Sequence, residues 1–217
     1  MNIEQARFNM VEQQVRPWDV LDAKVLDLLL QLRREDFVPE AWRALAFADL
    51  EIPLGGGEVM LSPKMEARMV QELALEPTDR VLEIGTGSGY VAALLAYLAS
   101  EVVSVEIDPV LAEKAAARVA QAAAGRTVSV VHGDGARDWA EGGPWNAILL
   151  SGSVPAEPTA LLARLAPGGR LLAVLGRAPV MTAMVWTRQD NTYTRIALFE
   201  TVIPPLHNAV QPSRFVL

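Results

Sequence analysis

Short apolar segments alternate with helical segments after Pro77, and this alternation constrains the fold more than any other feature. Buried parallel strands are continuous apolar runs, and their crossover connections are usually helices. We therefore predict a parallel sheet covered on both faces. The predicted strands are residues 80–84, 102–105, 128–131, 147–150 and 171–175, and the predicted helices are residues 90–98, 109–123 and 160–165. Asp108 is the predicted N-cap of the second of these helices, and Pro109 is its first residue.

The two ends of the chain differ from this pattern. Segments 181–187 and 194–202 flank a polar turn at 188–191, which predicts a hairpin and an antiparallel edge of the sheet. Segments 5–14, 20–32, 40–46 and 64–73 have helical spacing. The predicted fold is a doubly wound, Rossmann-like α/β fold with a mostly parallel sheet, an antiparallel C-terminal edge and an N-terminal helical addition. We expect a single domain over 1–217, with the helical addition in 1–76 and the α/β core in 77–217.

Composition excludes several classes of function. The 217 residues carry a net charge of −7 and no basic block, which disfavours nucleic-acid binding. The chain has no cysteine, so disulfides and thiolate metal sites are excluded, and we predict no metal. Residues 1–15 lack an apolar signal core, and segment 25–32 is too short to span a bilayer. We expect a cytoplasmic protein without membrane contact, and nothing in the sequence indicates its oligomeric state.

Three glycines, Gly85, Gly87 and Gly89, lie between the first predicted strand and the following helix. A tight turn and the close approach of a cofactor both require a residue without a side chain at such a place. The glycines alone are compatible with a nucleotide-binding loop or with a plain turn.

Two acidic residues narrow these alternatives. Glu106 ends the second strand, where an acid in nucleotide-binding α/β folds accepts hydrogen bonds from ribose hydroxyls. Glu83 precedes the glycines, where a carboxylate would repel the pyrophosphate of NAD or FAD. The spacing is G-x-G-x-G, which differs from the dinucleotide fingerprint. A cationic cofactor without phosphate fits better, so we predict S-adenosyl-L-methionine and a methyl-transfer reaction.

A third acid, Asp134, follows the third predicted strand at the same edge of the sheet. It is a candidate acceptor for the adenine amino group, although a turn or helix-capping aspartate is an equal alternative. His132, two residues earlier, is more simply structural. The predicted cofactor-binding residues are Glu83, Gly85, Thr86, Gly87, Ser88, Gly89, Glu106, Ile107, Asp134 and Gly135.

Several segments together resemble the protein-L-isoaspartate O-methyltransferases, within the class I S-adenosylmethionine-dependent methyltransferases. Residues 80–90 (RVLEIGTGSGY) and 103–108 (VSVEID) resemble the cofactor loop and ribose-binding strand of that family. Residues 34–39 (REDFVP) and 46–49 (AFAD) resemble its R-x-x-F-V-P and A-Y-x-D segments. The resemblance covers almost the whole chain and implies carboxyl methylation of isoaspartyl residues in damaged proteins or peptides.

The segment that corresponds to the family's substrate loop departs from the family pattern. Residues 55–63 read GGGEVMLSP where the family has roughly G-x-G-Q-T-I-S-x-P. Leu61 falls at the position of the family's active-site serine, and the neighbouring Ser62 is the candidate catalytic residue or, alternatively, a helix cap. The candidate substrate-binding residues are Glu58, Val59, Met60, Leu61, Ser151, Ser153 and His207.

Three functions remain open on the sequence alone. The first is methylation of isoaspartyl residues, as the resemblance implies. The second is methylation of another acceptor, such as a small molecule, because Leu61 offers no hydrogen-bond donor and Glu58 repels an anion. The third is a non-catalytic module that binds S-adenosylmethionine.

Overall fold

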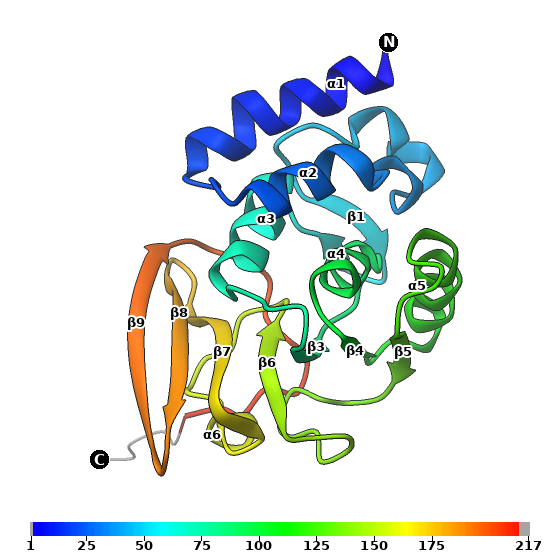
Figure 1. Ribbon diagram of the computed structural model, residues 1–217. Helices are drawn as coiled ribbons and strands as arrows, with labels where there is room; N and C mark the ends of the chain where they lie inside the picture. The colour runs from blue at the N-terminus through cyan, green and yellow to red at the C-terminus, as the bar shows by residue number, and fades with distance from the viewer. Residues whose placement is uncertain (1, 213–217) are drawn as a thin grey trace.

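The computed structural model describes residues 2–212 (Figure 1). Its N-terminal part packs helices and a small hairpin against one face of a larger sheet. The elements of this part are α1 (Ile3–Met10), a π-helical turn (Val11–Val15), a 3-10 turn (Arg16–Trp18), α2 (Ala23–Gln31), two further 3-10 segments (Arg34–Asp36 and Glu40–Leu45), β1 (Ile52–Gly55), β2 (Glu58–Met60) and α3 (Pro63–Glu72).

The remaining elements form a seven-stranded sheet in the order β5-β4-β3-β6-β7-β8-β9. Strands β3 to β7 pair in parallel, and β7, β8 and β9 pair antiparallel. This confirms the predicted α/β fold with its antiparallel C-terminal edge. The elements are β3 (Arg80–Ile84), α4 (Tyr90–Leu98), β4 (Glu101–Glu106), α5 (Pro109–Ala122), β5 (Val128–His132), β6 (Trp145–Leu150), α6 (Thr159–Leu162), β7 (Leu165–Arg177), β8 (Val180–Gln189) and β9 (Thr192–Glu200).

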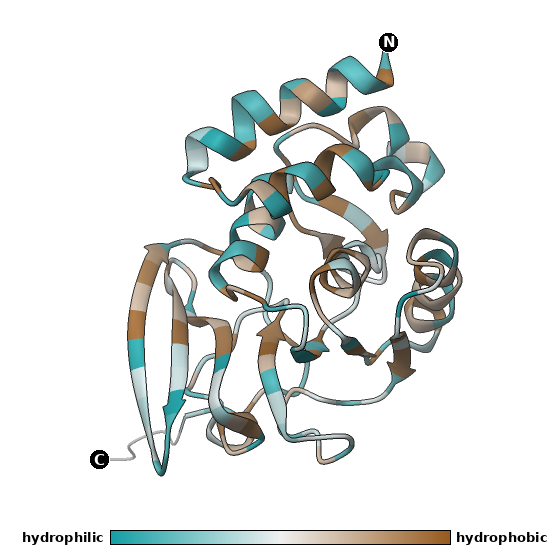
Figure 2. Cartoon of the chain, viewed as in Figure 1, coloured by the Kyte–Doolittle hydropathy of each residue, from teal (hydrophilic) through white to brown (hydrophobic). Residues whose placement is uncertain are grey.

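The sheet separates two hydrophobic cores because side chains alternate between its faces. Val81 and Leu149 lie in the core shared with the N-terminal helices, α3 and α4. Leu82 and Ile148, one residue away in each strand, lie in the opposite core with α6 and Trp186. Figure 2 shows hydrophobic residues on α4 and β6, whereas α1 is largely hydrophilic. Both faces are therefore covered, the second one mainly by loops and the short α6.

The hairpin β1–β2 was not predicted, since residues 55–63 were expected only to form a substrate loop. Its two-residue turn, Gly56 and Gly57, has positive φ at both positions (65° and 95°). Tight hairpins require this backbone conformation, and consecutive glycines adopt it without strain. The triple glycine is therefore a hairpin signal.

Two helix predictions need correction at their ends. The predicted helix over 160–165 is the shorter α6, because Leu165 already pairs with Trp145 in the sheet. The predicted helix over 5–14 is α-helical only to Met10 and continues as a π-helical turn. By contrast, the N-cap predicted for α5 is confirmed, because Asp108 Oδ1 accepts from the N–H groups of Val110 and Leu111. None of the helices within residues 2–212 has the length and apolar character needed to cross a membrane.

Candidate functional site

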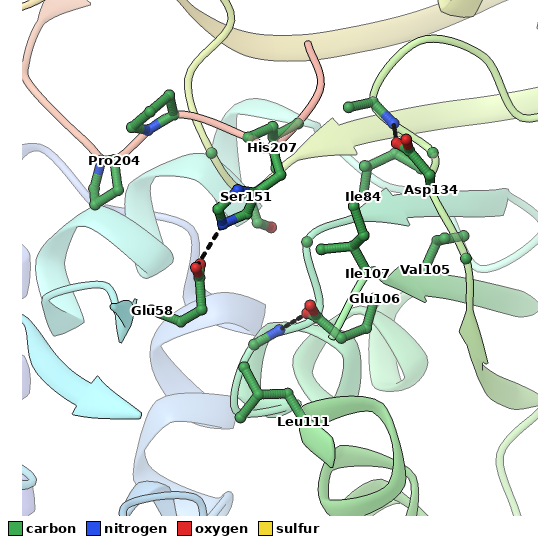
Figure 3. A pocket seen from close by; sticks show the side chains of 18 of the residues that line it. Glu58, Ile84, Val105, Glu106, Ile107, Leu111, Asp134, Ser151, Pro204 and His207 are labelled. Carbon is green, nitrogen blue, oxygen red and sulfur yellow. Dashed lines mark hydrogen bonds and ion pairs between the residues drawn. The ribbon is translucent and has the colours of Figure 1, made fainter. Parts of the chain in front are cut away.

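A pocket lies where the carboxyl ends of β3, β4, β5 and β6 meet. The chain runs from β3 through β4 to β5 on one side of the sheet and then crosses to β6 on the other side of β3. Ligands of open α/β sheets bind at such a reversal of strand order. The β1–β2 hairpin and residues 204–208, here called the C-terminal strap, form its outer wall (Figure 3). The pocket is lined by Glu58, Val59, Leu61, Ile84, Gly85, Gly87, Val105, Glu106, Ile107, Leu111, Gly133, Asp134, Gly135, Ala136, Ser151, Gly152, Pro204, Pro205, Leu206 and His207.

The glycine loop between β3 and α4 forms the floor of the pocket. Gly85 has φ of 93°, and a Cβ there would lie 3.0 Å from the side chain of Leu206 in the strap. Gly89 has φ of 88°, and a Cβ there would lie 3.0 Å from Val119 and 3.2 Å from Ala115 of α5. Gly85 thus leaves room on the pocket side, while Gly89 lets α5 pack closely against the start of α4.

Glu106, at the end of β4, closes the glycine loop. Its Oε2 accepts from the Gly87 N–H at 2.7 Å (Figure 3). Its Oε1 accepts from the Asp108 N–H at 3.0 Å. A carboxylate accepts about four hydrogen bonds, so both oxygens retain capacity on the pocket side. Glu106 is therefore fixed in place and able to accept from two vicinal hydroxyls of a ligand.

Glu83 lies behind the pocket wall in a chain of hydroxyl groups. Ser104 Oγ donates to its Oε2 at 2.7 Å, Ser151 Oγ donates to its Oε1 at 2.9 Å, and Thr86 Oγ1 lies 2.5 Å from Ser104 Oγ. Glu83 is fully buried, and burial raises its pKa to about 8 despite these donors. Among these residues only Ser151 lines the pocket, so Glu83 acts on the site by orienting the Ser151 hydroxyl.

Asp134, in the loop after β5, is held at the edge of the pocket. Its Oδ2 accepts from Asn208 Nδ2 at 2.9 Å, which ties this loop to the C-terminal strap. Its Oδ1 accepts from the Ala136 N–H at 3.3 Å. A second acidic acceptor therefore faces the pocket beyond Glu106.

A buried arginine, Arg34, supports the lip of the pocket, which is the segment of residues 55–63. Arg34 Nη2 donates to the Leu61 carbonyl at 2.7 Å, Nε donates to the Ala46 carbonyl at 2.9 Å, and Nη1 donates to Glu66. Arg34 and Glu66 are at most 3 % exposed. Burial raises the pKa of Glu66 to about 7, and Arg34 opposes that rise. The ion pair fixes the backbone that carries Leu61 into the pocket.

The lip also contacts the C-terminal strap. Glu58 Oε1 and His207 Nε2 lie 2.7 Å apart across the mouth of the pocket (Figure 3). The hydrogen bond and the charge of Glu58 raise the pKa of His207 above its ordinary value. The two segments that cover the pocket are thus joined by one polar contact.

The structure brings most of the predicted site residues to the pocket. Of the predicted cofactor residues, Gly85, Gly87, Glu106, Ile107, Asp134 and Gly135 line it, whereas Glu83, Thr86, Ser88 and Gly89 lie behind its wall. Of the predicted substrate residues, Glu58, Val59, Leu61, Ser151 and His207 line it, whereas Met60 and Ser153 are buried elsewhere.

Ser62, the candidate catalytic residue, does not line this pocket. It lines a neighbouring hollow with Trp18, Glu51 and Thr201. It occupies the N-cap position of α3, but its side chain makes no capping hydrogen bond. Among the described residues that line the pocket, the hydroxyl group is supplied by Ser151.

Sequence reasoning missed the apolar part of the wall. Leu111 lies in the first turn of α5, three residues after the Asp108 cap, and lines the pocket. Of the strap residues that line the pocket, His207 alone was a predicted site residue. The missed lining residues are Ile84, Val105, Leu111, Gly133, Ala136, Gly152, Pro204, Pro205 and Leu206.

The pocket's chemistry suits a cationic nucleoside. Its charged lining consists of Glu58, Glu106 and Asp134, with His207 as the single basic side chain in the part of the chain described. A phosphate-bearing cofactor would meet carboxylates without a lysine or arginine to balance its charge. Within residues 2–212, no group of three or more His, Cys, Asp or Glu side chains is placed to hold a metal ion.

Comparisons with known proteins point to one family. The family profile of Protein-L-isoaspartate(D-aspartate) O-methyltransferase (PCMT) matches residues 6–206. A protein-L-isoaspartate O-methyltransferase of Methylorubrum extorquens is 42% identical over 187 residues, covering 86% of this chain and 81% of the relative. Protein-L-isoaspartate O-methyltransferase 2 of an Anaeromyxobacter species is 40% identical over 213 residues, covering 98% and 83%.

Solved structures are similar in fold. A Plasmodium falciparum protein described as a protein-L-isoaspartate O-methyltransferase, in complex with S-adenosyl-L-homocysteine, has a TM-score of 0.79 at 19% identity, covering 95% of this chain and 98% of that one. A second protein-L-isoaspartate O-methyltransferase has a TM-score of 0.80 at 24% identity, covering 94% and 67%. At these identities the likeness concerns the fold.

Proposed function

The chain belongs to the protein-L-isoaspartate(D-aspartate) O-methyltransferase family, and from this premise we propose that its pocket methylates the carboxylate of L-isoaspartyl residues in damaged proteins or peptides. The protein is an S-adenosylmethionine-dependent O-methyltransferase. The observation that carries the proposal is the family match over residues 6–206, which includes both the glycine loop and the lip at residues 55–63. Its expected location is the cytoplasm.

The pocket residues fit the methyl donor. We assign the ribose hydroxyls to Glu106 and the adenine amino group to Asp134, because both acids present oxygen acceptors to the pocket. The positive φ and missing side chain of Gly85 let a ligand approach the glycine loop closely. The donor, when bound, supplies an electrophilic methyl group on a sulfonium.

The reaction requires positioning more than acid–base chemistry. A carboxylate acceptor is already deprotonated at neutral pH, so no general base is needed. The protein's contribution is to align one carboxylate oxygen with the methyl group and to exclude water. The β1–β2 hairpin and the C-terminal strap cover the pocket and supply this enclosure, with Leu61 and Leu206 as its apolar surfaces.

The side chain at Leu61 also supports a second class of methyl acceptor. Leu61 lines the pocket at the position of the family's serine, so the wall has an aliphatic group where the family has a hydroxyl. A neutral or small-molecule acceptor would tolerate this change. We propose the isoaspartyl acceptor first, because Arg34 holds the backbone at Leu61. In addition, Gly55, Gly57 and Pro63 of the lip match the family's loop pattern.

Paired peptides test the proposal. The purified protein is incubated with S-adenosylmethionine and a peptide that contains either an isoaspartyl or a normal aspartyl residue, beside a Leu61→Ser variant. We expect the wild-type protein to form a methyl ester on the isoaspartyl peptide alone. Donor binding without turnover of that peptide would remove the proposal, and turnover by Leu61→Ser alone would show that the lip has changed its acceptor.

A further inference from the structure

The pocket has an excess of negative charge at the place where an anionic acceptor must enter. Glu58, Glu106 and Asp134 line it, and His207 is the single basic side chain among its described lining residues. Because Glu106 and Asp134 are assigned to the methyl donor, Glu58 is the acid that repels an incoming carboxylate at the mouth, unless a cationic side chain receives that group. The charge balance of the mouth therefore depends on His207.

The other side-chain donors near the lip are unsuitable. The Ser151 hydroxyl donates a hydrogen bond to Glu83 Oε1 at 2.9 Å, and the side chain of Leu61 has no polar group. Ser62 faces the neighbouring hollow. Among the lining residues that the structure describes, His207 is thus the side chain left to donate a hydrogen bond to an acceptor carboxylate.

His207 is held in a fixed position by the strap. The Leu206 N–H donates to the Ser153 carbonyl at 2.9 Å, and the Ser153 N–H donates to the Pro204 carbonyl at 2.8 Å. Leu206 packs over Gly85 and Gly152. The imidazole therefore projects from an anchored backbone, and its side chain remains 58% exposed at the mouth.

Glu58 orients the ring and favours its charged form. Glu58 Oε1 engages Nε2 at 2.7 Å, and within residues 2–212 no protein group is hydrogen-bonded to Nδ1. In an imidazolium both nitrogens are donors. The Nε2–H then serves Glu58, while the Nδ1–H is available to a second carboxylate.

We propose that His207, oriented by Glu58, binds one carboxylate oxygen of the methyl acceptor and so sets the preference for an anionic acceptor. The second oxygen of the same carboxylate remains free to take the methyl group. The inference rests on the proposed function and adds to it the residue that selects the substrate's charge. It also gives Glu58, which alone would repel the substrate, a favourable role.

Steady-state kinetics across pH test this proposal. The groups that face His207 are Glu58 from β2, Glu106 from β4 and Asp134 from the loop after β5, while Arg137 Nε donates to the neighbouring Asn208 carbonyl. Because the protonated ring binds the anion, KM for an isoaspartyl peptide should be low at acidic pH and rise as His207 loses its proton. Glu58→Gln should move this rise to lower pH, since Glu58 raises the pKa of His207.

His207→Gln is the decisive variant, and His132→Gln is its matched control at the chain's other histidine. Losing a charge-assisted hydrogen bond should raise KM roughly ten- to hundred-fold in His207→Gln and abolish its pH dependence. The control should retain the wild-type KM and pH profile. Calorimetry with S-adenosylhomocysteine should give wild-type affinity for both variants, which shows that they are folded.

The outcomes separate the two proposals. A wild-type KM in His207→Gln, or an unchanged pH midpoint in Glu58→Gln, would overturn the role of His207 and leave the isoaspartyl activity standing. Absence of turnover in the wild-type protein, with S-adenosylhomocysteine bound normally, would overturn the proposed function and this inference with it.

Discussion

Replacing Arg34 by methionine should destabilise the protein and loosen the lip of its pocket. Arg34 is fully buried and donates to Glu66 and to the carbonyls of Leu61 and Ala46. Methionine has a similar length but no donor, so a buried carboxyl group and two carbonyls lose their partner. Breaking a buried ion pair in this way costs about 3–5 kcal/mol, a large fraction of the roughly 5–15 kcal/mol that stabilises a typical domain.

The cost should depend on pH with a defined sign. Burial raises the pKa of Glu66 to about 7, and Arg34 opposes the rise, so Arg34→Met pushes this pKa higher still. A folded-state pKa above the unfolded one means that stability is lost as pH rises toward the folded value. The wild-type protein stops losing stability once Glu66 is ionised, above its pKa of about 7, whereas the variant continues to lose stability at higher pH. The difference in unfolding free energy between the two proteins should therefore be larger at about pH 8.5 than at about pH 6.

Urea unfolding of both proteins across this pH range measures the difference. The double variant Arg34→Met/Glu66→Leu removes the unpaired acid as well, and should recover at least half of the loss because apolar side chains of similar volume often replace a buried pair without cost. A single-variant loss below about 1 kcal/mol, or a double variant less stable than the single one, would show that Arg34 does not stabilise the fold through its buried pair with Glu66.

Three further predictions address the pocket itself. Gly89→Ala should cost about 2–4 kcal/mol in urea unfolding, because alanine is strained at φ of 88° and its Cβ would crowd Val119 and Ala115; an undiminished stability would contradict the packing described. Glu83→Gln should gain stability relative to the wild type as pH rises from about 5 to 8. The wild-type glutamate, with its pKa raised to about 8, keeps in the folded state a proton that the unfolded chain releases, and glutamine has no such proton. Parallel pH profiles would contradict burial as the cause of the raised pKa. Glu106→Ala should weaken S-adenosylhomocysteine binding roughly ten- to hundred-fold in calorimetry, and an unchanged affinity would remove Glu106 from the donor site.

The sheet and its glycine loop were predictable because their determinants are local in sequence. Continuous apolar runs indicated β3, β4, β5 and β6, and Asp108 followed by Pro109 indicated the start of α5. Glu106 and Asp134 follow strand ends, and parallel strands bring such positions to one edge of the sheet. The pocket's acidic character therefore followed from residue order and general rules of α/β folds.

The lip of the pocket was not predictable in the same way, since its contacts join distant segments. Glu58 and His207 are 149 residues apart, and Arg34 meets Leu61 across 27 residues. No periodicity or spacing specifies such pairs. Ser62 and Ser151 show the consequence, because an adjacent position in sequence favoured Ser62 whereas chain geometry brings Ser151 to the pocket.

Glu83 illustrates a different limit. Its position before the glycines correctly suggested a site without phosphate, but sequence placed its carboxylate against the ligand. The structure buries it behind Ser151, where Ser104 and Ser151 satisfy its oxygens. Strand alternation assigns a residue to a face of the sheet, and the depth of that residue depends on the side chains packed around it.

The identity of the atom that receives the methyl group tests the proposed function most directly. Purified protein is given S-adenosylmethionine with a labelled methyl group and an isoaspartyl peptide, and the recovered label is then exposed to mild base. We expect a base-labile methyl ester on the isoaspartyl carboxylate and none on the matched aspartyl peptide. Label that resists base, or that appears equally on both peptides, would contradict the proposed function.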